Sequence, residues 1–119
     1  MSPHRHVFHI TERGAFAAAL DFGAYTAESL EREGFIHCST HAQVLRTAAR
    51  FFRGRTGLVL LCVDAERIAS LLRYEAADAE AFPHCYGAIP LEAILAVIDF
   101  PCCTDGSFEL PPELELFAE

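Results

Sequence analysis

The apolar run Leu58-Val59-Leu60-Leu61-Cys62-Val63 decides the fold class. An apolar run without polar alternation is typical of a strand that is buried on both faces. Gly54 and Gly57 enclose a turn just before it, so the strand begins sharply after the preceding element. We therefore predict a central strand over residues 58–63, with other elements covering both of its sides.

Shorter elements alternate around this strand. Further strands are predicted over residues 7–10, 35–39, 72–76 and 94–100 from their apolar and β-branched content. Helices are predicted over residues 12–21, ended by Gly23, over residues 40–53, started by a Thr40 and Gln43 capping box, and over residues 64–71, capped by Asp64. Pro83 and Gly87 mark residues 82–87 as a connection between elements. The fold class is α+β, a largely antiparallel sheet with two or three helices.

The length and the net charge of the chain limit the classes of function that it can have. A chain of 119 residues is one domain, which we place at residues 1–110, followed by an acidic C-terminal tail at residues 111–119. The net charge is −8 and every cation is arginine, which excludes Schiff-base and Walker-type lysine chemistry. The acidic balance makes nucleic acid an unlikely partner. No apolar run approaches the roughly 20 residues that cross a bilayer, and no secretion signal is evident, so we expect a cytoplasmic protein without membrane contact.

The five cysteines predict reduced thiols, because their number is odd and no C-x-x-C pair occurs. The dipeptides His37-Cys38 and His84-Cys85 resemble pieces of a metal site. Neighbouring side chains on a strand point to opposite faces, so the histidine and the cysteine of a pair cannot hold one ion. Cys38 is also expected in the core, which argues against a cysteine–histidine hydrolase. We predict no metal site.

An imidazole followed two residues later by a hydroxyl ends two of the predicted strands, in His9-Ile10-Thr11 and in His37-Cys38-Ser39. Side chains alternate across a strand, so each strand would bury its apolar residues and present a histidine with a hydroxyl on the reverse face. We interpret the two reverse faces together as the floor of one cleft. The alternative is that both histidines are structural and hydrogen bonded near helix caps.

Three other features are candidates for chemistry. Pro83 and Gly87 would hold His84 and Tyr86 rigidly with their polar ends toward a ligand, although the same segment could be a packed loop. Glu75 is a carboxylate in an apolar strand, where it needs a partner such as Arg73 or a task. An arginine face could bind an anion, or be merely solvated; its members are Arg46, Arg50, Arg53 and Arg55.

These features resemble, in order along the chain, the domain-of-unknown-function family numbered 952. The resemblance is carried by Val7–Thr11, Ser29-Leu30, Glu33–Ser39, Phe51–Gly54, Glu75, Phe82-Pro83-His84 and Tyr86-Gly87. It implies a fold similar to the ADP-ribosyltransferases, a split antiparallel sheet that binds NAD in a cleft, with a first-strand histidine on a ribose hydroxyl and a neighbouring backbone group on the carboxamide. Ile10 stands where that wider group usually has glycine, and its late glutamate has no firm match here, so Glu75 or His84 would stand in. In the similar RNA 2′-phosphotransferase branch arginines bind phosphate, and this resemblance suggests the same role for Arg53.

The function hypothesis is therefore a small domain that binds a nucleotide such as NAD, as co-substrate, in a histidine-lined cleft and acts as an ADP-ribosyl- or phospho-transferase. The catalytic candidates are His37, Glu75 and His84, and the binding candidates are His9, Thr11, Ser39, Arg53 and Tyr86. The rival hypothesis is a non-catalytic module that binds a small metabolite or a protein through the same cleft. Incubation with NAD separates them, since only the enzyme releases nicotinamide.

Overall fold

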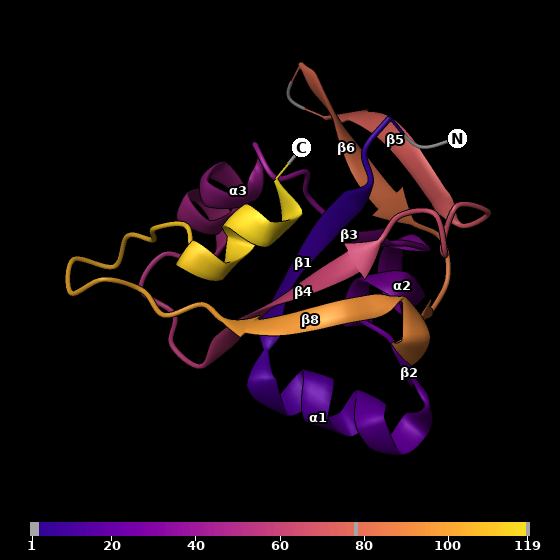
Figure 1. Cartoon of the computed structure of the whole chain (residues 1–119), viewed down its shortest axis with the longest axis horizontal. Helices are drawn as coiled ribbons and strands as arrows, with labels where there is room; N and C mark the ends of the chain where they lie inside the picture. The colour runs from indigo at the N-terminus through magenta and orange to yellow at the C-terminus, as the bar shows by residue number, and fades with distance from the viewer. Residues whose placement is uncertain (1–2, 78, 119) are drawn as a thin grey trace.

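The computed structural model describes residues 3–77 and 79–118 and has an α+β fold built on antiparallel sheets (Figure 1). The first sheet has the order β1-β4-β8, with β1 at His6–Glu12, β4 at Leu58–Asp64 and β8 at Ile94–Asp99. Residues 58–63 are buried throughout, so the predicted central strand is confirmed. The α+β class with a largely antiparallel sheet is confirmed as well.

The second sheet has the order β3-β6-β5, with β3 at Ile36–His37, β6 at Glu80–Cys85 and β5 at Leu72–Ala77. It meets the first sheet at one isolated bridge, where Phe8 and Ser39 exchange backbone hydrogen bonds of 2.8 and 2.7 Å. A short ladder between β2 (Ala24–Tyr25) and β7 (Ile89–Pro90) lies apart from both. The two larger sheets therefore diverge from the Phe8–Ser39 bridge, which is the feature that positions the site.

Two hydrophobic cores cover the two faces of the first sheet. One core packs α1 (Arg13–Phe22) and β2 against the face that carries Val7, Leu61 and Val63. The other packs α3 (Val44–Phe51) and the C-terminal segment against the face that carries Phe8 and Leu60. Figure 1 shows the same arrangement, with α1 on one side of the strands and α3 beside the C-terminal helix on the other. Double coverage explains why β4 has no polar alternation.

The helix boundaries follow from local signals. Gly23 ends α1 with a φ of 98°, a left-handed conformation that glycine adopts without strain, and its N–H donates to the Ala19 carbonyl. The short helix α2 spans Glu28–Glu33. The Gln43 side chain accepts the Thr40 N–H at 3.0 Å, as the capping box predicts, but residues 41–43 form a turn and α3 begins only at Val44. The predicted start at residue 40 is therefore wrong.

Two other predicted elements are wrong. Residues 65–71 form turns instead of a helix. Arg67, Ala69 and Leu71 donate their N–H groups to carbonyls three residues earlier, and Ala65 and Ile68 are buried in the first core. Residues 80–85 form strand β6 instead of a connection. Pro83 is tolerated there because it lies at the end of the β3–β6 pairing, where its carbonyl still accepts the Cys38 N–H at 3.0 Å.

The C-terminal residues pack against the domain. Two 3₁₀ helices follow the second sheet, η1 at Leu91–Ala93 and η2 at Pro112–Phe117. In η2, Leu114 is buried in the second core and the Phe117 ring contacts the rings of His6 and Phe8 edge-on. The expectation of a surface tail at residues 111–119 therefore misses this packing for the described residues. No helix in the described part of the chain is long and apolar enough to span a bilayer.

Replacing Leu114 with alanine is expected to lower the free energy of unfolding by about 3 kcal/mol, since the change leaves a cavity in the second core. Leu116, two residues away, is 81% exposed. The Leu116→Ala variant should therefore change stability by less than about 0.5 kcal/mol. Urea unfolding of both variants checks this, and equal stability of the two would contradict the packing of η2.

Candidate functional site

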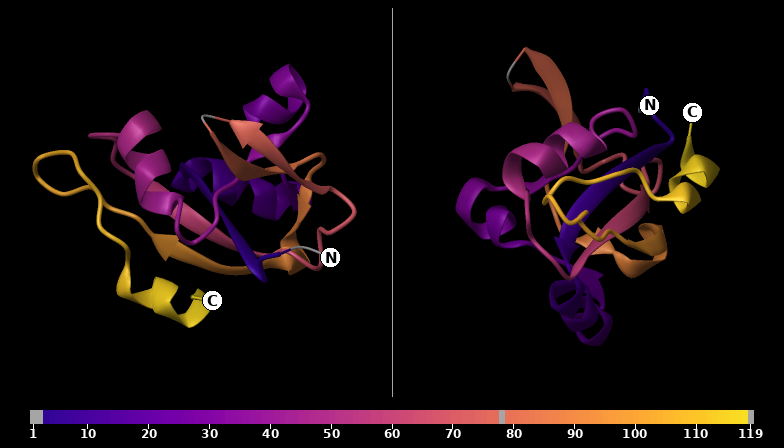
Figure 2. Two further views of the ribbon diagram at one scale, coloured as in Figure 1. Left: turned by 90° about the horizontal axis from the view of Figure 1, so that it is seen from above. Right: turned by 90° about the vertical axis from the view of Figure 1, so that its left-hand side faces the viewer.

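A groove of about 740 Å³ lies between α3 and the second sheet. The register pairs His84 of β6 with His37 of β3 on one side and with Arg73 of β5 on the other. Ser39 lies two residues beyond His37, so strand alternation places both on the same face, which is the groove floor. The β5–β6 hairpin projects from the body of the molecule near α3 (Figure 2). The split between the sheets thus creates a concave site with polar residues on its floor.

Aromatic rings form one end of the groove. The Phe35 ring stacks on the His84 imidazole with ring centres 4.0 Å apart and an interplanar angle of 16°. The His37 ring lies 4.8 Å from Phe35 and 5.5 Å from His84. Phe82, Phe51 and Phe52 add further aromatic surface to the groove. Such surfaces stack on flat heterocycles, so this end suits a base or another planar ring.

The helical spacing of the apolar residues in α3 predicts one buried stripe, which includes Val44, Ala48 and Phe51. Val44 and Ala48 are buried as this spacing predicts. The Phe51 ring, in contrast, is 64% exposed and lies on the groove wall. Phe51 is the last residue of α3. The exposed ring is therefore available to a ligand.

Polar side chains also line the groove. Arg46 is paired with Glu80 across it, from α3 to β6. This arginine holds the pKa of Glu80 below its ordinary value. Arg50 of α3 also lines the groove, and the Ser39 and Thr47 hydroxyls lie 2.8 Å apart within it. Arginine guanidinium groups are well suited to phosphate oxygens, so this part of the groove suits an anion.

Glu75 contacts His84 but does not itself line the groove. One carboxylate oxygen of Glu75 accepts from His84 Nδ1 at 2.7 Å and also from the Tyr86 hydroxyl. These two bonds, with the Tyr86 bond the stronger cause, hold the pKa of Glu75 below its ordinary value. The Arg73 guanidinium lies 4.8 Å from the centre of the Tyr86 ring. The partner proposed for Glu75 from the sequence, Arg73, thus acts on it mainly at a distance, and His84 and Tyr86 are its direct partners.

His9 lies where the two larger sheets separate, next to the Phe8–Ser39 bridge. After the Phe8–Ser39 bridge, a continuing antiparallel ladder would pair Ile10 with His37. Instead, His9 Nδ1 donates to the His37 carbonyl at 2.6 Å, and the Tyr25 hydroxyl lies 2.8 Å from His9 Nε2. Burial lowers the pKa of His9 to about 4. The ring is therefore neutral at pH 7, with its proton on Nδ1, and it takes the place of a backbone pair where the strands separate.

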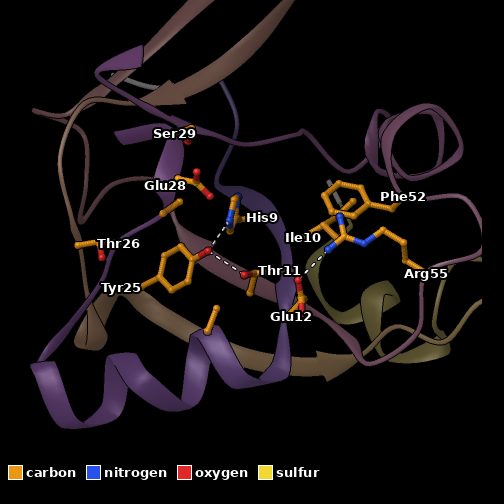
Figure 3. Close-up of a pocket in the computed structure, with 12 residues that line it drawn as sticks. His9, Ile10, Thr11, Glu12, Tyr25, Thr26, Glu28, Ser29, Phe52 and Arg55 are labelled. Carbon is orange, nitrogen blue, oxygen red and sulfur yellow. Dashed lines mark hydrogen bonds and ion pairs between the residues drawn. The ribbon is translucent and has the colours of Figure 1, made fainter. Parts of the chain in front are cut away.

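A smaller pocket of about 290 Å³ is also lined by His9 (Figure 3). Figure 3 shows the Tyr25 side chain extending toward His9 and Thr11, and the Tyr25 hydroxyl lies 2.8 Å from Thr11 Oγ1. Arg55 forms an ion pair with Glu12 at 2.8 Å at the opposite wall. The residues common to both cavities are His9, Ile10 and Phe52. The two cavities therefore meet at the end of β1.

The structure gathers some predicted site residues and separates others. The groove is lined by His9, His37, Ser39 and His84. Thr11 lines the smaller pocket instead, and β1 has no solvated reverse face, since His9 and Thr11 are buried under α1 and β2. Glu75 and Tyr86 stand behind His84. Arg53 lies at neither cavity; its guanidinium donates to the Asp105 carbonyl at 3.3 Å.

Several residues that shape the groove had no functional signal in the sequence. Phe35 looks like an ordinary strand residue, and Thr47 and Glu80 have no motif. Arg46 and Arg50 belong to the arginine face, where helical spacing alone does not separate them from Arg53. Only the contact between α3 and β6 identifies which arginines reach the groove.

The thiols near the groove are inert. Cys38 and Cys85 are buried in the first core, as the alternation of their strands predicts for Cys38. Burial raises the pKa of Cys85 to about 11 and that of Cys38 further. Neither thiol is ionised near pH 7, so neither is an activated nucleophile. Within residues 3–77 and 79–118 no three histidine, cysteine, aspartate or glutamate side chains are gathered in a way that could hold a metal ion.

Comparisons with known proteins match the chain to a family and to solved structures. Residues 10–97 match the model of the family described as "Protein of unknown function (DUF952)". The chain is similar to the crystal structure of protein CC0527 from Caulobacter crescentus, with 32% identity and a TM-score of 0.86 over 92% of this chain and 98% of that one. The solution NMR structure of CC0527 gives 33% identity and a TM-score of 0.79 over 94% and 98% of the two chains. No curated protein matches the sequence.

Proposed function

The chain belongs to the family described as "Protein of unknown function (DUF952)", and for this member we propose that the groove binds a nucleotide such as NAD. The observation that carries the proposal is that aromatic rings and arginine side chains line the same groove. Phe35 and Phe82 offer stacking surface to a base, and Arg50 offers charge to phosphate. The groove volume of about 740 Å³ lies within the range of small-molecule sites, roughly 300–1,000 Å³.

The split between the sheets supports a second part of the proposal. Backbone groups alternate in direction along a strand, so those of Ile10 point toward β3, where no ladder continues after the isolated Phe8–Ser39 bridge. Ile10 lines both cavities. Its N–H and C=O would bind a polar group of the ligand such as a carboxamide, with His9, Ser39 and Thr11 around the same ligand. Phosphates would contact Arg50 in place of Arg53.

As a catalyst, the protein would be an ADP-ribosyl- or phospho-transferase. His37 and His84 line the groove, and Glu75 and Tyr86 support His84 from behind. In this proposal the histidines handle charge and protons at the bond that breaks, and the rest of the groove orients the nucleotide.

A non-catalytic module for a small metabolite or protein is the second candidate, and one observation favours it. Both ring nitrogens of His9 already have partners, the His37 carbonyl and the Tyr25 hydroxyl. A ligand hydroxyl could replace Tyr25 only by breaking one of these bonds. Release of nicotinamide from NAD during prolonged incubation separates the candidates, since a binding module would leave the dinucleotide intact.

NAD at about 100 times its dissociation constant is expected to raise the melting temperature by on the order of 10 °C. The Arg50→Gln variant should show less than half of this shift, because the groove loses charge that faces phosphate. Arg67→Gln is the matched control, since Arg67 lies at neither cavity and pairs with Asp64. Thermal melts with NAD, AMP and nicotinamide measure the effect. The absence of a shift with every nucleotide would refute the proposal.

A further inference from the structure

Glu75 and His84 form a carboxylate–imidazole pair at the groove wall. The distance from Nδ1 of His84 to the carboxylate oxygen is 2.7 Å, and the His84 side chain is only 10% exposed. A carboxylate oxygen accepts, so Nδ1 carries the proton and Nε2 is the basic nitrogen of the neutral ring. His84 lines the groove, while Glu75 does not. The pair is therefore oriented with its basic partner on the ligand side.

The surroundings fix this orientation. Glu75 lies opposite Phe82 in the β5–β6 register, one step diagonal from His84, which is within reach of a long side chain. The Tyr86 hydroxyl donates to the same Glu75 oxygen, and Phe35 stacks on the imidazole. The His84 ring therefore cannot turn without losing its hydrogen bond to Glu75 and its stacking contact with Phe35.

A second pair of the same residue types provides a contrast. His37 Nε2 is 3.0 Å from a carboxylate oxygen of Glu33, but this pair lies on the surface, with the His37 side chain 53% exposed. Glu33 and His37 are four residues apart in sequence, at the end of α2 and in β3. The Glu75–His84 pair, in contrast, is assembled by two strands. Only the latter is held in one geometry.

We propose that His84 is a general base positioned by Glu75, and that the second substrate is an oxygen nucleophile, water or an alcohol. The inference rests on the proposed binding of NAD in the groove. Water and alcohols are weak nucleophiles until they lose a proton, which is the task that a fixed imidazole nitrogen performs. Glu75 then faces the positive imidazolium that results, as a positioning residue that never touches the substrate.

The step balances without a redox partner. The nucleophile's oxygen forms a bond to C1′ of the nicotinamide ribose, and its proton moves to Nε2 of His84. The bond from C1′ to the nicotinamide nitrogen breaks, and its electron pair leaves with nicotinamide. With water the products are ADP-ribose and nicotinamide. With an alcohol the products are nicotinamide and an O-glycoside of ADP-ribose.

Nicotinamide release from NAD, measured in the wild type and in variants with and without sodium azide, tests the inference. His84→Ala is expected to lower the rate by about 100-fold to 10,000-fold, and Glu75→Gln by about tenfold or more. Azide is an anion that needs no base, so it should restore release in His84→Ala by at least about tenfold and yield the glycosyl azide. Glu92→Gln makes the same charge change as Glu75→Gln on an exposed residue outside both cavities and should leave the rate unchanged.

Calorimetric titration separates this inference from the proposal beneath it. The dissociation constant for NAD should stay within about threefold in Glu75→Gln, because Glu75 does not line the groove and acts through His84. Failure of the wild type to bind NAD overturns the proposed function and the inference together. NAD that binds without release of nicotinamide in the wild type overturns the inference alone. A His84→Ala rate equal to that of the wild type also overturns the inference alone, and so does a His84→Ala rate that azide does not restore.

Discussion

Lowering the pH from about 7 to about 5 is expected to reduce the free energy of unfolding by about 2 kcal/mol through His9 alone. Burial lowers the pKa of His9 from 6.5 to about 4 in the folded protein. The unfolded chain therefore binds a proton at His9 near pH 6.5, while the folded protein resists it until about pH 4. Protons favour the unfolded state, so this stability is complete above about pH 6.5 and declines as the pH falls toward 4.

Other groups enter the acid response at lower pH. Glu75 and Glu80 also have lowered pKa values, but their ordinary value is 4.5, so the stability they contribute is lost mainly below about pH 5. The window from about pH 7 to about pH 5 therefore isolates His9 from these carboxylates. Urea unfolding at several pH values within the window measures the slope.

Two substitutions make the pH experiment decisive. His9→Gln keeps an amide that can donate to the His37 carbonyl, yet it cannot titrate. We expect this variant to be less stable than wild type at pH 7 and to lose about 2 kcal/mol of the pH dependence. His37→Gln is the histidine control; its side chain is exposed, and the backbone carbonyl that binds His9 is unchanged, so the slope should remain. An unchanged slope in His9→Gln would show that His9 does not hold the sheets as described.

Replacing Leu61 with alanine is expected to lower the free energy of unfolding by about 3–5 kcal/mol. Leu61 has no exposed surface and belongs to the first core, under α1 and β2. Leu60 is equally buried but belongs to the second core, under α3 and η2. Leu60→Ala should therefore cost a similar amount, although the two side chains point to opposite faces of β4. In a sheet with one solvated face, only one of two neighbouring leucines would lower the free energy of unfolding strongly when replaced with alanine.

Stability measurements on both variants test the double coverage of β4. Leu95→Ala on the edge strand β8 is the control, since Leu95 is largely exposed and should change stability by less than about 1 kcal/mol. A small effect at either Leu60 or Leu61 would contradict the assignment of a core to that face of the sheet.

Much of the framework follows from local sequence. The apolar run at residues 58–63 determines a buried strand, and alternation determines that Ile36 and Cys38 face the core while His37 does not. Gly23 ends α1 because only glycine adopts the required φ without strain. These are properties of a few neighbouring residues, so they can be derived before any tertiary contact is known.

Local signals fail where two conformations are close in energy. Residues 65–71 have helical composition, but Ala65 and Ile68 are buried in the first core and the backbone closes successive turns there. Pro83 suggests a connection, although its missing N–H costs little at the end of the β3–β6 pairing. In both cases contacts with distant parts of the chain, the first core and strand β3, accompany the conformation that forms.

For the site, the sequence by itself determined the chemistry, namely histidines paired with hydroxyls on two strands, a rigid His84 segment and one uncommon carboxylate, Glu75. Only the tertiary structure decided their arrangement. It buried His9 and Thr11 under α1 and β2, brought Arg46 and Arg50 to the groove, left Arg53 outside and set Glu75 behind His84. The physical reason is that periodicity specifies which side chains share a face, whereas the element that covers a face is chosen by contacts between residues far apart in the chain.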